Sequence, residues 1–146
     1  MIVKLAISGC LVACCVFIHA VGVMAMFRWL GRTSSLADPR FWPPLWLLIR
    51  LASWLILMHL CEISLWALCY FWGGAMPDCY AAFYFSSVTY TTVGYGDLVL
   101  PHNWRLLGGV EALTGILMCG WSTGFFFMVV DRMFHARSVS SAFGKE

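Results

Sequence analysis

The residues best suited to chemistry form one short run, Thr91-Thr92-Val93-Gly94-Tyr95-Gly96-Asp97. Glycine at alternate positions permits a left-handed φ there, so that successive backbone carbonyls can point to one side of the strand. Four copies around an axis would stack these oxygens into rings that replace the hydration shell of a cation. We expect the Thr92 hydroxyl to add one more ring, and the Tyr95 ring to point away from the axis and wedge the strand against its scaffold.

The composition predicts a membrane environment for this segment. Of the 146 residues, 62% are apolar and 11% are charged, whereas a soluble domain has about 45–50% apolar and about 25% charged residues. A chain of this length cannot bury so much apolar surface from water. Irregular backbone at membrane depth is tolerated only where protein buries it or where it lines a water-filled path. The sequence therefore predicts an all-α integral membrane protein.

The same composition argues against several other classes of protein. The net charge is +2 and includes no basic stripe, so no nucleic-acid partner is expected. The seven cysteines form no CxxC pair, which favours small buried side chains over a zinc site or a disulfide framework. No nucleophile, phosphate-binding loop or metal-ligand spacing suggests catalysis, so we do not expect an enzyme.

Three stretches, 5–27, 44–72 and 106–130, are long and apolar enough to cross a membrane, since a bilayer needs about 20 helical residues. The segment before Thr91 reads as a short re-entrant helix over 79–90, with Asp78 as its N-cap. Its C-terminus would point inward at a water-filled cavity, where about −0.5 of a charge from the macrodipole favours a cation.

Basic residues predict the orientation of these spans. They gather between the first and second spans and after the third span, at Arg28, Arg32, Arg40, Arg132, Arg137 and Lys145. Both groups face the cytoplasm by the positive-inside rule if 78–100 does not cross the membrane fully, which leaves Lys4 and Arg105 outside. The first span is either a retained helix or a cleaved signal peptide with Lys4 as its basic start. Its apolar core is longer than the usual 7–15 residues or so of a signal peptide, which favours retention.

The motif Thr92-Val93-Gly94-Tyr95-Gly96, with Thr91 before it and Asp97 after it, closely resembles the filter of the potassium-channel pore family. The resemblance covers residues 45–131 and is greatest to small bacterial channels with a two-helix pore. It implies that the backbone carbonyls of 92–95 and the Thr92 hydroxyl bind K⁺, while Gly96 and Asp97 close the outer mouth. It further implies a homotetramer in the plasma membrane, surrounded by lipid, with the filter facing outside and no cofactor besides the permeant ion.

The resemblance also implies a domain organisation. Residues 1–30 would form an additional N-terminal transmembrane helix, 31–44 a cytoplasmic linker, 45–131 the pore domain and 132–146 a short cytoplasmic tail. Within the pore domain, the expected elements are an outer helix, a pore helix, the filter and an inner helix, at 45–72, 79–90, 91–97 and 105–131.

Other side chains are assigned by the same resemblance. Tyr84 and Phe85 occupy positions where the family places pore-helix aromatics against the filter tyrosine, and Tyr84 is within reach of Asp97. Val88 departs from one bacterial pattern, in which a buried glutamate stands behind the filter; a filter-inactivation mechanism that relies on that carboxyl is therefore in doubt.

Glycines and aromatics on the third span have two interpretations each. Gly115 lies where the family often has a gating hinge, and Gly120 and Gly124 are further candidates, but small residues also allow close helix packing. The run 125–127 either narrows the cytoplasmic mouth or faces lipid.

Two carboxyls, Glu62 and Glu111, lie inside apolar spans and are costly there. At about 1.5 Å of rise per residue, both fall near the level of the filter. We expect them to brace pore-helix or filter backbone groups, with proton sensing as the alternative. His59 shares a helix face with Glu62 and could form a hydrogen-bonded pair with it. His19 is expected to make an interhelical contact, or, with His59, to ligate haem.

The sequence thus predicts a potassium-selective channel. The alternatives are a weakly selective cation channel and a non-conducting membrane subunit with the same fold. No span carries regularly spaced basic residues, so a voltage-sensing helix is not expected.

Overall fold

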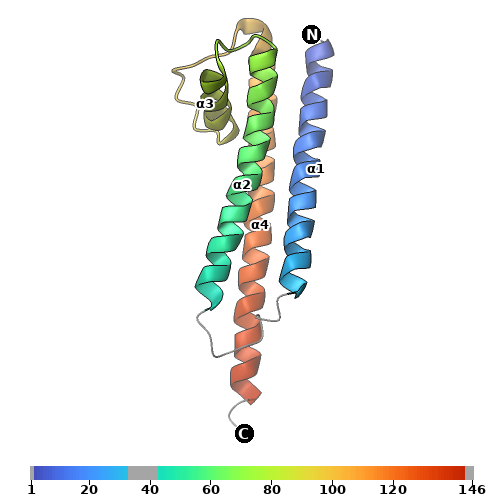
Figure 1. Ribbon diagram of the computed structural model, residues 1–146, viewed down its shortest axis with the longest axis vertical. Helices are drawn as coiled ribbons and strands as arrows, with labels where there is room; N and C mark the ends of the chain where they lie inside the picture. Colours follow the sequence, from blue (N-terminus) through green and yellow to red (C-terminus); the bar gives the residue numbers. More distant parts are fainter. Residues whose placement is uncertain (1, 33–42, 144–146) are drawn as a thin grey trace.

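The computed structural model describes residues 2–32 and 43–143, and in these ranges all regular secondary structure is helical, with turns and extended backbone between the helices. Its α-helices are α1 (Ile2–Arg32), α2 (Pro43–Trp72), α3 (Cys79–Tyr90) and α4 (Arg105–Phe143), with a 3-10 turn, η2 (His102–Trp104), before the last. The three long helices run side by side, and α3 lies at the end of the bundle that also holds the N-terminus (Figure 1). Helices α1 and α2, together with η2 and most of α4, provide three segments long and apolar enough to cross a membrane.

The helix bounds lie within one or two residues of the sequence-based expectations except at the C-terminal end. The pore helix was expected over 79–90, and α3 has these bounds. The inner helix was expected to end at 131, but α4 continues to Phe143 and includes most of the predicted tail. No glycine or proline occurs between Gly124 and Gly144, and His135 Nδ1 lies 3.3 Å from Asp131 Oδ1, one turn away. Nothing in this segment therefore stops the helix.

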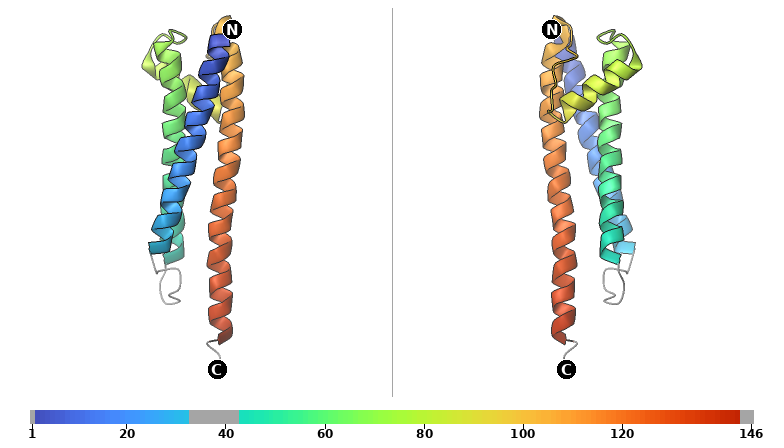
Figure 2. Two further views of the ribbon diagram at one scale, coloured as in Figure 1. Left: turned by 90° about the vertical axis from the view of Figure 1, so that its right-hand side faces the viewer. Right: turned by 90° about the vertical axis from the view of Figure 1, so that its left-hand side faces the viewer.

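The two ends of the bundle carry different charged residues. Lys4 Nζ donates a 2.9 Å hydrogen bond to the Asn103 carbonyl and lies 4.0 Å from the centre of the Trp104 ring. Lys4 and Arg105 therefore share the end that holds α3, as expected. The other end holds Arg32, the last residue of α1, and the C-terminal half of α4 (Figures 1 and 2). Arg40, Lys145 and most of the predicted linker lie outside the described residues.

Helix α1 packs against α2 and α4 along its length. Near the α3 end, Leu11 and Cys15 join a core that contains Trp66, Tyr90 and Met118. Near the other end, a second core gathers side chains from α1, α2 and α4, namely Val23, Met26, Leu51, Met58, Phe125 and Val129. The first helix is therefore packed onto the expected outer and inner helices.

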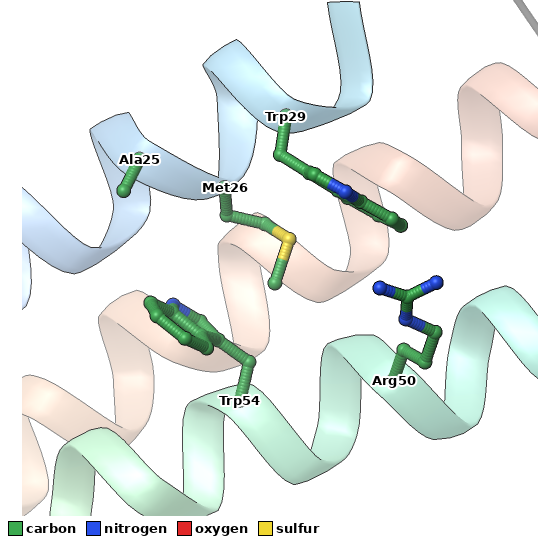
Figure 3. Close-up of a pocket in the computed structure, with 5 residues that line it drawn as sticks. All are labelled: Ala25, Met26, Trp29, Arg50 and Trp54. Carbon is green, nitrogen blue, oxygen red and sulfur yellow. The ribbon is translucent and has the colours of Figure 1, made fainter. Parts of the chain in front are cut away.

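At the interface between α1 and α2, the two helices approach closely at one glycine and are joined by a cation–π contact. A Cβ atom on Gly22 would lie 2.1 Å from Met58 Sδ, so any larger residue there would require the Met58 side chain to move. Further along, a groove of about 210 Å³ is lined by Ala25, Met26, Trp29, Arg50 and Trp54 (Figure 3). The Arg50 guanidinium carbon lies 4.4 Å from the centre of the Trp29 ring. Both contacts tie α1 to α2.

The aromatic run on α4 has a third role that the sequence did not suggest. Phe125 is 4% exposed and meets the edge of Phe27 on α1, with ring centres 4.9 Å apart. It therefore packs inside the chain, contrary to both expectations for it. Phe127, in contrast, is 70% exposed.

Candidate ion-coordinating segment and the polar ring behind it

The segment after α3 has a backbone that alternates in handedness. Thr92, Gly94 and Gly96 have φ values of 61°, 55° and 77°, whereas Val93 and Tyr95 between them do not have positive φ. Such alternation turns successive carbonyls toward one side of the strand, which is the arrangement needed for stacked oxygen rings. The two glycines adopt left-handed conformations, as their positions predicted.

Thr92 is the member of this pattern that the sequence did not reveal. A positive φ is a genuine outlier for a β-branched residue, and such strain costs about 1–3 kcal/mol. Within the described residues, Thr92 is the single non-glycine residue with positive φ. Strain of this kind persists where the surrounding structure imposes it, and it concentrates at functional sites.

Local hydrogen bonds hold both ends of α3, the helix that precedes this segment. Asp78 accepts a 2.7 Å hydrogen bond from the Ala81 amide, so it is the N-cap that was expected. At the other end, the Thr91 hydroxyl donates to the Ser87 carbonyl at 2.7 Å. The Gly94 amide then reaches back 3.2 Å to the Val88 carbonyl. These contacts fix the direction in which the strand leaves α3.

The strand after α3 is not covered by the rest of its own chain. Residues 91–99 are exposed, with Val93 at 53% and Tyr95 at 73%. The Tyr95 side chain is thus largely uncovered by its own chain, and the predicted wedging of Tyr95 would need other surfaces.

Tyr84 and Asp97 meet at the outer end of the strand. The Tyr84 hydroxyl donates a 2.7 Å hydrogen bond to Asp97 Oδ2, which confirms that the two side chains reach each other. Asp97 Oδ1 also accepts from the Leu98 amide at 3.0 Å. The Tyr84 hydrogen bond and, to a lesser extent, backbone hydrogen bonds lower the pKa of Asp97, and the same contact raises the pKa of Tyr84. Asp97 therefore remains a carboxylate at the mouth of the strand.

Phe85 does not share this location. Its ring meets Tyr70 of α2 edge-on, with centres 5.4 Å apart. One residue along a helix turns the side chain by about 100°, so Tyr84 and Phe85 cannot serve the same surface. Phe85 supports the scaffold behind the strand.

Glu111 of α4 connects α4 to both α2 and α3. It is fully buried, accepts a 2.8 Å hydrogen bond from the Tyr70 hydroxyl, and accepts a second one from Ser86 of α3. The expectation that it braces the pore helix is correct in location, but its partners are side-chain hydroxyls rather than backbone groups. Backbone amides within α3 are already used in its helical hydrogen bonds, so hydroxyls are the donors left for a carboxylate.

Glu62 is the centre of a second buried cluster. Its Oε1 lies 2.9 Å from Nδ1 of His19 on α1, which confirms an interhelical contact for His19. Its Oε2 accepts a hydrogen bond from the hydroxyl of Tyr90, the last residue of α3. His59 Nδ1 lies 3.6 Å from the same oxygen, too far for the predicted hydrogen bond, and contacts the Tyr90 hydroxyl at 3.2 Å instead.

Ser122 of α4 closes this cluster into a ring. Its hydroxyl oxygen lies 3.1 Å from His19 Nε2 and 3.0 Å from His59 Nε2. The polar ring therefore runs through side chains of all four α-helices, namely Glu62, His19, Ser122, His59 and Tyr90. Both imidazoles turn Nδ1 toward Glu62 and Tyr90 and Nε2 toward Ser122.

A hydrogen count shows that the polar ring is one hydrogen short when Glu62 is ionised. Each of its five contacts needs one hydrogen atom. With Glu62 ionised, two hydroxyls and two neutral imidazoles supply one hydrogen each, which leaves one contact without a donor. A further proton or another cation would satisfy every member.

The geometry also removes the haem interpretation of the two histidines. Axial haem ligands approach the iron from opposite faces of the macrocycle. Here both Nε2 atoms touch one hydroxyl oxygen, and the ring centres are 5.4 Å apart. No macrocycle fits between rings held in this way.

Gly115 lies where α4 touches the end of α3. A Cβ atom there would lie 1.9 Å from the Tyr90 carbonyl oxygen, whereas Gly120 and Gly124 have nothing within 4 Å of the corresponding position. Close packing is therefore the role that the structure gives Gly115. The hinge interpretation of Gly115 and Gly120 stays a prediction.

Four contributors to these clusters were missed from the sequence: Tyr70, Ser86, Tyr90 and Ser122. Ser86 and Tyr90 are four residues apart and therefore share one face of α3. That spacing was a usable signal, because a polar pair on the buried face of a re-entrant helix needs partners such as the two carboxyls.

Comparison with known families places most of this region in one domain. A family model described as "Ion channel" matches residues 54–132, more than half of the chain. The match includes α3, the strand after it and most of α2 and α4, while α1 lies outside it. Neither the curated proteins nor the solved structures gave a match.

Proposed function

The chain belongs to the ion-channel family, and we propose that it conducts K⁺ selectively through a filter formed by residues 92–96. The family and the three membrane-capable helices indicate a multi-pass membrane protein. They also favour a channel rather than an enzyme. The selectivity for K⁺ is our inference from the strand after α3.

The alternating backbone is the observation that carries this proposal. Thr92, Gly94 and Gly96 have positive φ, so the carbonyls of 92–95 can converge on one axis. Rings of such carbonyls replace the hydration shell of K⁺, with binding strong enough for entry and weak enough for exit to an adjacent site. The Thr92 hydroxyl supplies the innermost ring.

A single strand cannot surround an ion, so the proposal requires four copies. The exposure of Val93 and Tyr95 supports such an assembly, because the chain itself leaves these two side chains open to contact with another copy. In a homotetramer we expect Tyr95 to wedge against the neighbouring subunit rather than against its own chain.

The orientation follows from the charges. Arg28 and Arg32 lie near the end of α1 that is opposite to α3 (Figure 1). If these basic residues face the cytoplasm, the filter opens to the outside of the plasma membrane and the C-terminal end of α4 is cytoplasmic. Glu62 and Glu111 would then act as internal braces of the pore helix.

Reversal potentials test the proposed function. The purified protein is placed in planar bilayers with K⁺ on one side and Na⁺ on the other. A reversal potential near the K⁺ equilibrium potential supports the proposal. A value near zero would indicate a weakly selective channel, and absence of current from intact tetramers under all applied voltages and pH values would indicate a non-conducting subunit.

Two alanine variants make this test specific to the filter. Gly94→Ala places a side chain at a residue with φ 55°, whereas Gly109→Ala adds the same atom inside α4 with nothing within 4 Å. We expect Gly94→Ala to lose K⁺ preference and Gly109→Ala to retain it. Unchanged preference in both variants would overturn the assignment of the filter.

A further inference from the structure

The polar ring contains three side chains with the geometry of metal ligands. His19, His59 and Glu62 each offer one ligand atom, and these atoms lie within 4.8 Å of one another. We propose that these three residues bind a divalent transition-metal ion, with Zn²⁺ the best match, and that the ion joins α1 to the pore domain.

The three donor atoms lie close together, within 4.8 Å of one another. Nδ1 of His19 lies 2.9 Å and Nδ1 of His59 lies 3.6 Å from the Glu62 carboxylate oxygens. Ligands at about 2.0–2.1 Å from a tetrahedral Zn²⁺ lie roughly 3.3 Å apart. The two measured distances lie on either side of that spacing, and side-chain rotation would have to bring the three donors to it. The Tyr90 hydroxyl, 3.2 Å from His59 Nδ1, is the next oxygen at the site.

Ser122 supplies the outer contacts that such a site requires. A histidine that ligates metal through one nitrogen normally donates its other N–H to a fixed acceptor. Here the Ser122 oxygen lies 3.1 Å and 3.0 Å from the two Nε2 atoms and has two lone pairs for them. When both Nε2 atoms carry the hydrogen, both Nδ1 lone pairs point toward Glu62.

The charge balance favours a cation at this position. Glu62 and His19 are fully buried, so a carboxylate at Glu62 has no access to water. A buried carboxylate is stable only when it is paired or bound to metal. A metal ion satisfies both Nδ1 lone pairs and the carboxylate together, while the Tyr90 hydroxyl continues to donate to Glu62.

The consequence concerns α1, which lies outside the matched ion-channel region. His19 is the ligand from α1, whereas His59 and Glu62 belong to α2. A metal ion would therefore fasten the additional helix to the pore domain beside Tyr90, immediately before the filter strand. Of the three ligands, His59 is the one with an open side, at 18% exposure of its side chain.

Cysteines are the competing donors that the experiment must separate. The chain has seven free cysteines, and Cys15 is buried one turn before His19 on α1. Because Zn²⁺ binds thiolates strongly, Cys15→Ser serves as a control that should leave the proposed site intact.

Metal binding to the full-length protein tests the proposal directly. Protein stripped with a chelator is titrated with Zn²⁺ against a chromophoric chelator, and Co²⁺ is added separately as a spectroscopic probe. We expect one ion per chain and a tetrahedral Co²⁺ visible spectrum without thiolate charge-transfer bands. His19→Gln and His59→Gln should weaken binding by more than about 100-fold, and Ser122→Ala by roughly 10- to 100-fold.

His135→Gln is the matched control, since His135 faces Asp131 on α4 away from the ring and is 78% exposed. It should bind metal like the wild type, as should Cys15→Ser. Size-exclusion profiles of each variant verify assembly, and Ser122→Ala keeps the test valid if a histidine variant does not assemble. No stoichiometric binding, thiolate bands in the Co²⁺ spectrum, or equal binding by His59→Gln and His135→Gln would overturn the proposal. Ion flux is not the readout, so failure of the proposed channel function would be seen separately.

Discussion

The filter strand and the polar ring lie a few residues apart but are built in opposite ways. The strand at 91–97 is exposed, carries a strained Thr92 and leaves its backbone oxygens uncovered by the chain itself. The ring formed by Glu62, His19, Ser122, His59 and Tyr90 is largely buried, and all its contacts are made within one chain. On our proposals, the first region is completed by other copies of the chain, whereas the second is completed within one chain by a bound cation. Tyr90 is the link between them.

Gly115→Ala should have the largest effect, because it breaks the packing on which both regions depend. The new Cβ would lie 1.9 Å from the Tyr90 carbonyl oxygen, which is backbone and cannot move away cheaply. Overpacking of this kind costs about 1–3 kcal/mol or more. We expect a lower melting temperature of the purified protein and loss of conduction. Gly120→Ala, with open space at the same atom, is the control, and equal behaviour of the two variants would contradict the packing role.

Glu111→Ala should come next and should affect stability more than selectivity. It leaves the buried Tyr70 hydroxyl without its 2.8 Å acceptor. An unpaired buried donor costs about 1–3 kcal/mol, which thermal unfolding in detergent would detect.

Glu111→Gln is the matched variant for this comparison. Its amide oxygen can still accept from Tyr70, and Ser86 can instead donate to the Ile63 carbonyl, which lies 2.9 Å away. We therefore expect a smaller loss of stability than for Glu111→Ala. If both variants unfold at the same temperature, the hydrogen bonds do not brace the pore helix.

Thr92→Gly separates the filter from the fold. Removing the side chain from a residue at φ 61° relieves left-handed strain of about 1–2 kcal/mol. The melting temperature should stay the same or rise, while the innermost ring loses its hydroxyl and conduction falls. Thr92→Ser, which keeps the hydroxyl, should conduct better than Thr92→Gly. The reverse order in single-channel recordings would argue against a role for the hydroxyl.

Tyr84→Phe should have the smallest effect, confined to acid pH. The Tyr84 hydrogen bond is the main cause of the lowered pKa of Asp97. A carboxylate with a lowered pKa contributes stability above its ordinary pKa, and this is lost as pH falls through the lowered value. Without the hydroxyl, the pKa of Asp97 should move back up, so acid-induced loss of conduction should begin at a higher pH.

Tyr80→Phe, on the exposed side of the same helix, is the control for this change. It should retain the acid sensitivity of the wild type. If the pH dependence of conduction in Tyr84→Phe matched that of both the wild type and Tyr80→Phe, the Tyr84 contact would not control the pKa of Asp97.

The sequence alone predicted the helices, the left-handed glycines of the proposed filter strand and the burial of the two carboxyls. Apolar length defines a membrane-capable helix, Asp78 defines the start of α3, and glycines at 94 and 96 permit the left-handed backbone. These features depend on local residue types and spacing, so no neighbouring element is needed to read them. The extension of α4 to Phe143 was missed, because the change to polar residues after 131 was interpreted as the end of the helix.

Only the tertiary structure decided which side chains meet. His19 and Ser122 are 103 residues apart, yet they share a hydrogen bond, and Phe125 is buried against α1 instead of facing a pore or lipid. Helix rotation and crossing determine such contacts, and an apolar sequence with little amphipathic pattern leaves both undetermined. The structure also gives Thr92 a positive φ, a conformation that its β-branched side chain disfavours and that its residue type did not predict. Residue types therefore indicated the proposed filter strand, while helix packing assembled the polar ring behind it.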